Sequence, residues 1–170
     1  MRNNLQTYSV QNFNALSNII NDLFSKNYLL RRKAREDLLE LGEPGINHLT
    51  ELAKNEDESK RWEAIKLIQQ IGNDETINVL LTALEDDEFS IRWLASEGVI
   101  NMGKHGIIPL LETIIQKPSS TYLKRSAHHI LKELRRTGIF KDNYGIVEAI
   151  ANEYEDSIIL LKIKQTLRTM

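Results

Sequence analysis

Small and aliphatic residues recur along the chain at a spacing typical of helices that bury one side. Four alanines lie 30, 31 and 32 residues apart, and apolar residues follow each alanine four and seven positions later. Residues at i, i+4 and i+7 share one side of an α-helix, so each segment predicts a helix that buries this stripe. The stripes are Ala34, Leu38 and Leu41; Ala64, Ile68 and Ile71; Ala95, Val99 and Met102; and Ala127, Leu131 and Leu134.

A second apolar pattern lies before each of these segments. Its spacing is also helical, so each repeating unit is predicted to be a pair of short antiparallel helices joined by a tight turn. The residues are Phe13, Leu16, Ile19, Ile20 and Leu23; Ile46, Leu49 and Leu52; Ile77, Leu80, Leu81 and Leu84; and Ile107, Leu110, Leu111 and Ile114.

Signals for helix ends support these units. Gly42, Gly72 and Gly103 directly follow the first three stripes, where glycine can close a helix in the left-handed conformation. Arg135 takes this place in the fourth unit, so its helix is expected to run longer. The acidic stretches "NEDES" at 55–59 and "EDDEFS" at 85–90 precede two stripes and are expected to cap helix amino termini.

The repetition predicts an all-α protein with one domain over residues 1–170. Its repeats are expected at 12–42, 45–72, 75–103 and 106–136. A degenerate capping pair is expected at 143–170, as solenoid ends require a cover. Its first helix would bury Ile146, Val147 and Ile150, and its second Ile163, Leu167 and Met170.

Composition agrees with a helical cytoplasmic protein. The 170 residues include only 8 Gly and 3 Pro, which favours helices. The 22 Lys and Arg nearly balance 24 Asp and Glu, which argues against a nucleic-acid or anionic-membrane binder. The absence of Cys excludes disulfides and thiolate sites. The start, "MRNNLQTYSV", lacks a signal-peptide pattern, and no apolar run is long enough to cross a membrane.

These units resemble the HEAT-like repeats of phycobilisome lyases, whose short unit combines a cation, small residues, a Leu-type position and a closing Gly. The resemblance covers residues 12–135 best. It implies an α-solenoid, a right-handed superhelix of about five helix pairs, whose alanine-containing helices line the concave surface. The resemblance does not identify a particular biochemical activity, because such repeats occur in scaffolds, enzyme subunits and adaptors.

The two tryptophans occupy the same position of successive units. At about 100° per residue, Trp62 and Lys66 lie opposite the stripe of Ala64, and Trp93 and Glu97 lie opposite that of Ala95. Stacked helices would align them into a partner-binding surface. Its expected residues are Trp62, Trp93, Arg32, Lys33, Lys66, Phe89, Leu94, Tyr122, Arg125 and His129. The alternative is that the indole rings lie flat against neighbouring repeats and contribute only to stability.

A cation precedes each stripe alanine by three residues: Arg31, Arg61, Arg92 and Lys124. These side chains lie close enough to the stripe to reach acidic residues of the loops, such as Asp57 or Asp86. We therefore expect them to connect adjacent repeats rather than to bind a partner.

Patterns for catalysis or metal binding are weak. His128 and His129 are adjacent and so diverge on a helix, which is not the i, i+4 geometry of helical metal sites. The stretch "MGKHG" at 102–106 joins two helices and lacks phosphate-loop spacing. Glu36, Glu63 and Glu97 have basic or polar neighbours and are interpreted as a solvated face. No metal, cofactor or catalytic residue is assigned.

The sequence therefore predicts a non-catalytic scaffold or adaptor that binds another protein or a peptide on its concave face, as a monomer or weak homo-oligomer. Two alternatives stay open. One is a HEAT-like enzyme or lyase subunit. The other is a nucleic-acid-binding protein similar to alkylpurine DNA glycosylases, which hold DNA with concave aromatic residues and an acid.

Overall fold

The structure is a computed structural model and describes residues 16–170. The predicted start of the first repeat at residue 12, and Phe13 within it, lie outside these residues. The described residues form helices and no strand, which confirms the all-α prediction. The chain divides into two compact units, one ending at His48 and one beginning at Leu49, and each is described by itself. The expectation of a single domain stays a prediction.

The first unit contains a helical segment at residues 16–23, helix α2 (Tyr28–Glu40) and most of α3 (Glu43–Leu52). Asn27 caps α2, where its side chain accepts a hydrogen bond from the amide of Leu29. Ala34 and Leu38 are buried, as the stripe predicts. Leu41 is exposed, contrary to the prediction, because α2 ends at Glu40 and Leu41 is the C-cap residue at the turn.

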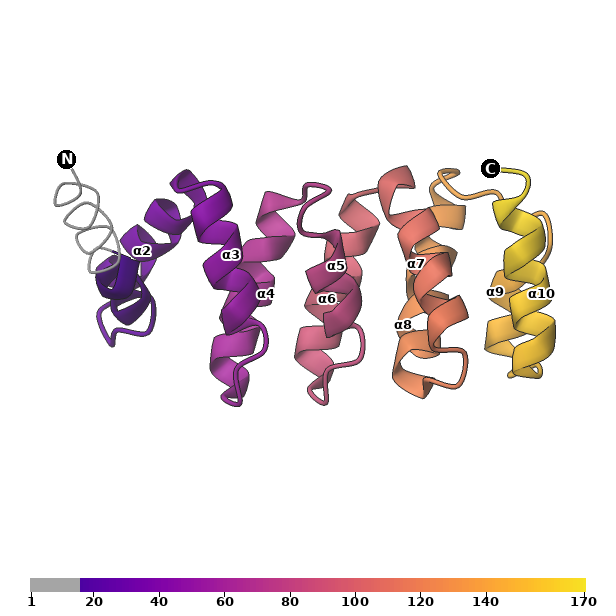
Figure 1. Cartoon of the computed structure of the whole chain (residues 1–170), viewed down its shortest axis with the longest axis horizontal. Helices are drawn as coiled ribbons and strands as arrows, with labels where there is room; N and C mark the ends of the chain where they lie inside the picture. Colours follow the sequence, from indigo (N-terminus) through magenta and orange to yellow (C-terminus); the bar gives the residue numbers. More distant parts are fainter. Residues whose placement is uncertain (1–15) are drawn as a thin grey trace, which may run out of the picture. The chain divides into compact units, whose positions relative to one another are not determined.

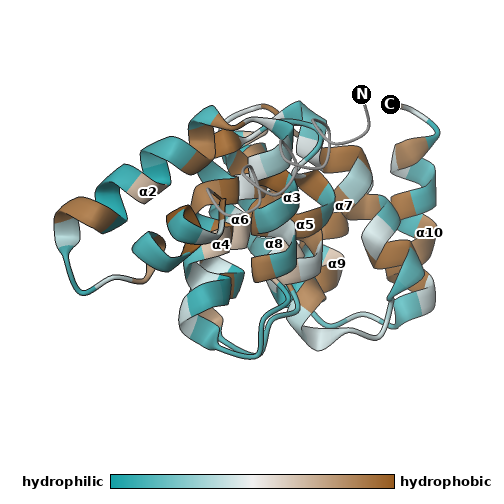
Figure 2. Cartoon of the chain, turned by 60° about the vertical axis from the view of Figure 1, so that its left-hand side comes forward, coloured by the Kyte–Doolittle hydropathy of each residue, from teal (hydrophilic) through white to brown (hydrophobic). Residues whose placement is uncertain are grey.

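The second unit contains seven helices among its described residues, all in the segments where the apolar patterns predict them. They are α4 (Glu58–Ile71), α5 (Ile77–Ala83), α6 (Phe89–Asn101), α7 (Lys104–Gln116), α8 (Thr121–Arg136), α9 (Ile146–Ala151) and α10 (Asp156–Leu167). The loops between them are mostly hydrophilic (Figure 2). Asp57 caps α4 by accepting a hydrogen bond from the amide of Ser59, which confirms the capping role of the first acidic stretch.

The helices of this unit stack in two layers (Figure 1). Helix α6 packs between α4 and α8 in one layer, and α5 packs against α7 in the other. The predicted stripes lie between the layers: Ala64, Ile68, Ala95, Val99, Ala127 and Leu131 are all fully buried. Since each pair buries its stripe against its neighbours, the stability of this core depends on the stacking of consecutive pairs.

The last helix pair is reversed relative to these layers. Helix α9 packs on α8, whereas α10 packs on α7 (Figure 1). The connection before α9 spans residues 137–145, while α6 and α7 are separated only by Met102 and Gly103. Within this long connection Phe140 is buried, and the carboxylate of Asp142 accepts hydrogen bonds from the amides of Ile146 and Val147. These contacts hold the connection as it crosses from one layer to the other.

The reversal changes which residues of α10 are buried. Its buried side consists of Ile159, Ile163 and Thr166. Only Ile163 of the predicted stripe is fully buried, and Met170 is exposed because it lies beyond the end of the helix at Leu167. The predicted stripe is therefore wrong in this helix, since its apolar residues face α7 and α9 rather than a preceding second helix.

Positive φ angles mark most of the predicted helix ends. Gly42 and Gly72 have φ of +63° and +56° after α2 and α4. Gly103 also has positive φ, but its ψ of −126° lies outside the left-handed helical region and it serves as the N-cap of α7. Helix α8 runs on to Arg136, as predicted, and Gly138 with φ of +77° closes it.

Helices α8 and α9 end in the same hydrogen-bonding motif with different residues at its critical position. After α8, the amides of Gly138 and Ile139 donate to the carbonyls of Arg135 and Leu134. After α9, Glu153 and Tyr154 make the equivalent bonds to Ile150 and Ala149. Both are Schellman motifs, whose left-handed residue is usually glycine. Glu153 holds this conformation with φ of +52°, at a cost of about 1 kcal/mol for a residue with a Cβ atom.

We therefore expect Glu153→Gly to raise the free energy of unfolding by about 0.5 kcal/mol. Relief of the left-handed strain exceeds the additional backbone entropy that glycine gains in the unfolded chain. Urea denaturation followed by circular dichroism measures the change. Asn152→Gly is the matched control, because Asn152 has φ of −93° and needs no glycine, and this variant should be less stable. A loss of stability in Glu153→Gly would contradict the assignment of strain.

Candidate functional site

A repeated arginine contact positions the helices that carry the candidate site. Arg31, Arg61 and Arg92 each donate hydrogen bonds through Nη1 to two backbone carbonyls of the loop just before their own helix. Each loop is thereby fastened to the first turn of the helix that follows it. This local role explains the arginine at this position in the first three units, whereas Lys124 in the fourth unit pairs with Asp156 instead.

Two of the predicted cations also connect neighbouring repeats, as expected. Arg61 makes a bidentate ion pair with Asp86, with distances of 2.7 Å from Nε to Oδ2 and 3.0 Å from Nη2 to Oδ1. Lys124 of α8 lies 2.8 Å from Asp156 of α10. These pairs fix α4 to the loop before α6 and α8 to the start of α10.

Exposed aromatic side chains gather where α6 and α8 lie side by side. The ring centroids of Phe89 and Trp93 are 6.3 Å apart, and the Trp93 indole stacks on the imidazole of His129 at 4.8 Å. The guanidinium of Arg92 lies 4.2 Å from the ring centroid of Tyr122 and joins that ring to the same cluster. Phe89, Trp93 and Tyr122 are 67%, 47% and 40% exposed. We call Phe89, Trp93, Tyr122 and His129 the aromatic patch.

A hydrogen bond across the two helices holds the patch in shape. Nε2 of His129 lies 3.1 Å from Oε1 of Glu97, and both side chains are partly buried. His129 is therefore fixed by Glu97 on its edge and by Trp93 on its face. Glu97 and His129 are thus in direct contact across the two helices, and this contact restricts the conformations of the Trp93 ring as well.

Trp62 has a different environment from Trp93. It is half-buried on α4, and the ammonium of Lys66 lies 4.7 Å from its ring centroid. Among the described residues no ring contact joins Trp62 to Trp93. The prediction from helical geometry that Trp62 and Lys66 share one side of α4 is confirmed, but the indole rings of Trp62 and Trp93 do not stack on each other.

The other predicted site residues lie in different environments and do not join the aromatic patch through a described contact. Arg125 is exposed and makes no hydrogen bond or ion pair with the described residues, whereas Leu94 is half-buried. In the first unit, Arg32 pairs with Glu36 and Lys33 with Asp37 on α2, and the hydrogen bond to Asp37 raises the pKa of Lys33. Their position relative to the aromatic patch is not described, so their place in a common surface stays a prediction.

The interpretation of Glu63 as part of a solvated face is wrong. Glu63 is only 6% exposed, and the polar residue Ser126 on α8 is buried as well. Ser126 donates a hydrogen bond to the carbonyl of Leu84 in the preceding helix pair. Glu63 and Ser126 therefore pack between repeats instead of facing solvent, because neighbouring helices are in direct contact on this side.

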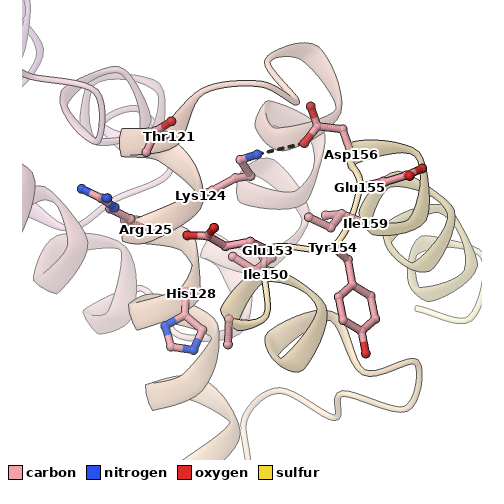
Figure 3. A pocket seen from close by; sticks show the side chains of 11 residues that line it. Thr121, Lys124, Arg125, His128, Ile150, Glu153, Tyr154, Glu155, Asp156 and Ile159 are labelled. Carbon is pink, nitrogen blue, oxygen red and sulfur yellow. Dashed lines mark hydrogen bonds and ion pairs between the residues drawn. The ribbon is translucent and has the colours of Figure 1, made fainter.

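A groove that the sequence did not predict lies beside α8 (Figure 3). It has a volume of about 740 Å³ and is formed where α8 faces the turn between α9 and α10. We call it the α8 groove; it is lined by Thr121, Lys124, Arg125, His128, Ile150, Ala151, Glu153, Tyr154, Glu155, Asp156 and Ile159. The stretch "EYED" at 153–156 is the sequence signal that could have drawn attention to it.

Other kinds of site find no support in residues 16–170. No three His, Asp or Glu side chains of this part of the chain gather as ligands for a metal ion. Its helices are also all too short or too polar to span a membrane.

The paired helices of the second unit, stacked in two layers, are the architecture of a helical repeat solenoid. A family model of HEAT repeats matches residues 46–132, and the chain belongs to this family, which confirms the predicted resemblance to HEAT-like repeats. No curated protein matches the chain.

Proposed function

We infer that this HEAT-repeat protein binds another protein, or a peptide segment of one, through the aromatic patch and without catalysis. The observation that carries the inference is that Trp93 remains 47% exposed although neighbouring rings hold it on two sides. Exposed apolar surfaces of this kind mark contact sites, and Trp and Tyr dominate the binding energy of protein interfaces.

The fixed geometry of the patch favours binding. A side chain that is already held in one conformation loses little entropy when a partner covers it. Trp93 meets this condition through its contacts with Phe89 and His129, and His129 through its hydrogen bond with Glu97. The patch therefore offers a preorganised anchor for an apolar side chain of the partner.

Charges beside the patch indicate what surrounds that apolar side chain. Arg125 lies on α8 between Tyr122 and His129, at i+3 and i−4 spacing, and so shares their side of the helix. Its guanidinium is exposed and makes no ion pair with the described residues. An acidic residue next to the apolar anchor of the partner would complete this contact.

A capture experiment with a matched control tests the proposal. The wild-type protein and a Phe89→Ala/Trp93→Ala variant are immobilised and exposed to an extract of the cells that contain the protein naturally. We expect the variant to retain its partner at least about tenfold less, as for loss of an interface hot spot. Ile108→Ala removes an exposed aliphatic side chain from α7, in the other layer, and should leave capture unchanged.

Fluorescence locates the contact once the captured protein is purified. A Trp62→Phe variant leaves Trp93 as the only tryptophan, so its emission should shift to shorter wavelength when the partner covers it. Binding through an apolar patch should also persist in high salt, whereas nucleic-acid binding would fall steeply. Unchanged Trp93 emission with a bound partner, or equal capture by the alanine variant, would refute the proposal. A much lower melting temperature of that variant would favour a structural role for the patch.

A further inference from the structure

The α8 groove exists because α9 covers only part of α8. Helix α9 has six residues and is about 9 Å long, whereas the sixteen residues of α8 extend about 24 Å. The contact of Glu148 with Arg135 places α9 beside the second half of α8. The first half, from Thr121 to His128, faces the α9–α10 turn across the groove.

The α8 side of the groove carries little free positive charge in its interior. Lys124 is paired with Asp156, which also accepts a hydrogen bond from Ser119. Burial, and secondly the charge of Lys132, lower the pKa of His128, so its imidazole is neutral at pH 7. The remaining cation on this side is Arg125, whose guanidinium is exposed to solvent.

The opposite side presents carboxylates that are available to a ligand. Figure 3 shows the side chain of Glu153 extending from the turn toward α8. This carboxylate makes no hydrogen bond or ion pair with the described residues. Glu155 follows two residues later and is exposed, with a contact to the hydroxyl of Ser157 at 3.5 Å. Ile150 and Ile159 lie at the base of the groove but are only 7% and 2% exposed, so the contact offered to a ligand is mainly electrostatic.

The backbone of Glu153 adds an independent reason to assign it a role. The same motif at the end of α8 contains Gly138, which adopts the left-handed conformation without strain. At the end of α9 the chain keeps a residue with a long charged side chain in this conformation and directs it into the groove. Strain that persists beside a cavity is typical of a functional position.

We propose that the α8 groove binds the side chain of a lysine or arginine from a partner, with the cationic group at Glu153 and the alkyl chain between α8 and the α9–α10 turn. The site lies outside the aromatic patch. It therefore does not depend on the function proposed for that patch, and each proposal can fail without the other.

Titration with small amides of single amino acids tests this site in the full chain. Chemical shifts of the ¹⁵N-labelled protein are followed during addition of Nα-acetyl-arginine amide, which carries one cationic group and no other charge. We expect shifts concentrated at residues 121–128 and 150–156, with a dissociation constant on the order of millimolar for so small a ligand. The uncharged Nα-acetyl-norleucine amide and the anionic Nα-acetyl-glutamate amide should leave these signals nearly unchanged.

Two variants of Glu153 separate ligand binding from structural support. Glu153→Gln keeps the shape of the side chain, removes its charge and should weaken binding of the arginine probe about tenfold. Glu153→Gly should bind equally poorly although its melting temperature rises. The proposal is overturned if the arginine probe shifts no groove residue, if norleucine amide shifts the same residues equally, or if Glu153→Gln binds like the wild type.

Discussion

Replacing Asp86 with alanine is expected to lower the free energy of unfolding by about 3 kcal/mol. The side chains of Arg61 and Asp86 are only 16% and 9% exposed, so the change leaves a largely buried guanidinium without a carboxylate to balance its charge. The strength of this contact is also seen in the pKa of Arg61, which the hydrogen bond to Asp86 raises above its usual value. Oδ1 of Asp86 additionally accepts a hydrogen bond from the amide of Glu88 before α6, and alanine loses that contact too.

Urea denaturation followed by circular dichroism measures this loss. Asp86→Asn should cost less than alanine, because the amide oxygen can still accept the hydrogen bond of Glu88. The control is Glu51→Ala, which removes the exposed ion pair with Lys54 and should change stability by less than about 0.5 kcal/mol. Equal small effects of Asp86→Ala and Glu51→Ala would show that the Arg61 pair behaves like a surface contact.

Gly106→Ala is expected to destabilise the protein by about 2 kcal/mol, although alanine is normally the better helix residue by about 1 kcal/mol. A Cβ atom at Gly106 would lie 2.9 Å from both the carbonyl oxygen and Cγ1 of Val99. The carbonyl belongs to the backbone of α6 and cannot move unless the two-residue turn between α6 and α7 opens. The clash therefore outweighs the gain in helix propensity.

A second glycine in the first unit shows the same close approach. A Cβ atom at Gly45 would lie 2.3 Å from the carbonyl oxygen of Leu38, again seven residues earlier. The stretches "LGEPGI" at 41–46 and "MGKHGI" at 102–107 share this spacing. Chemical denaturation of Gly106→Ala tests the mechanism, with Glu75→Ala as control, because exposed Glu75 is the residue three positions after Gly72. A stabilised Gly106→Ala variant would show that the turn yields to the new methyl group.

The main features of the fold could be predicted because each repeat satisfies local rules. Ala64, Ala95 and Ala127 lie in buried stripes whose period is that of the α-helix itself, so no knowledge of neighbours is needed to find them. The same holds for the glycine at the end of α4 and for the acidic cap at Asp57. The prediction that Leu41 and Met170 are buried was wrong because both residues lie beyond helix ends. There the helical period no longer determines where a side chain points.

The candidate site was predicted only in part. The helical spacing identified the exposed side of α6 that carries Trp93. Phe89 is the first residue of α6 and Tyr122 the second of α8, so both lie at the helix starts beside that side. Whether aromatic side chains touch depends on how far neighbouring helices are shifted along their axes, which no single helix determines. For this reason Trp93 meets His129 while Trp62 is covered by Lys66, and Glu63 is buried in a row that looked solvated.

By itself, the sequence determined the helical repeats, their alanine stripes and the side of α6 that carries Trp93, because these follow from the period of one helix. Only the tertiary structure decided that α9 and α10 exchange layers and that a groove opens beside α8. It also decided the burial of Glu63 and the stacking of Trp93 on His129. These features arise from the packing of residues distant in the chain, whose energy depends on the shapes of all the surfaces in contact.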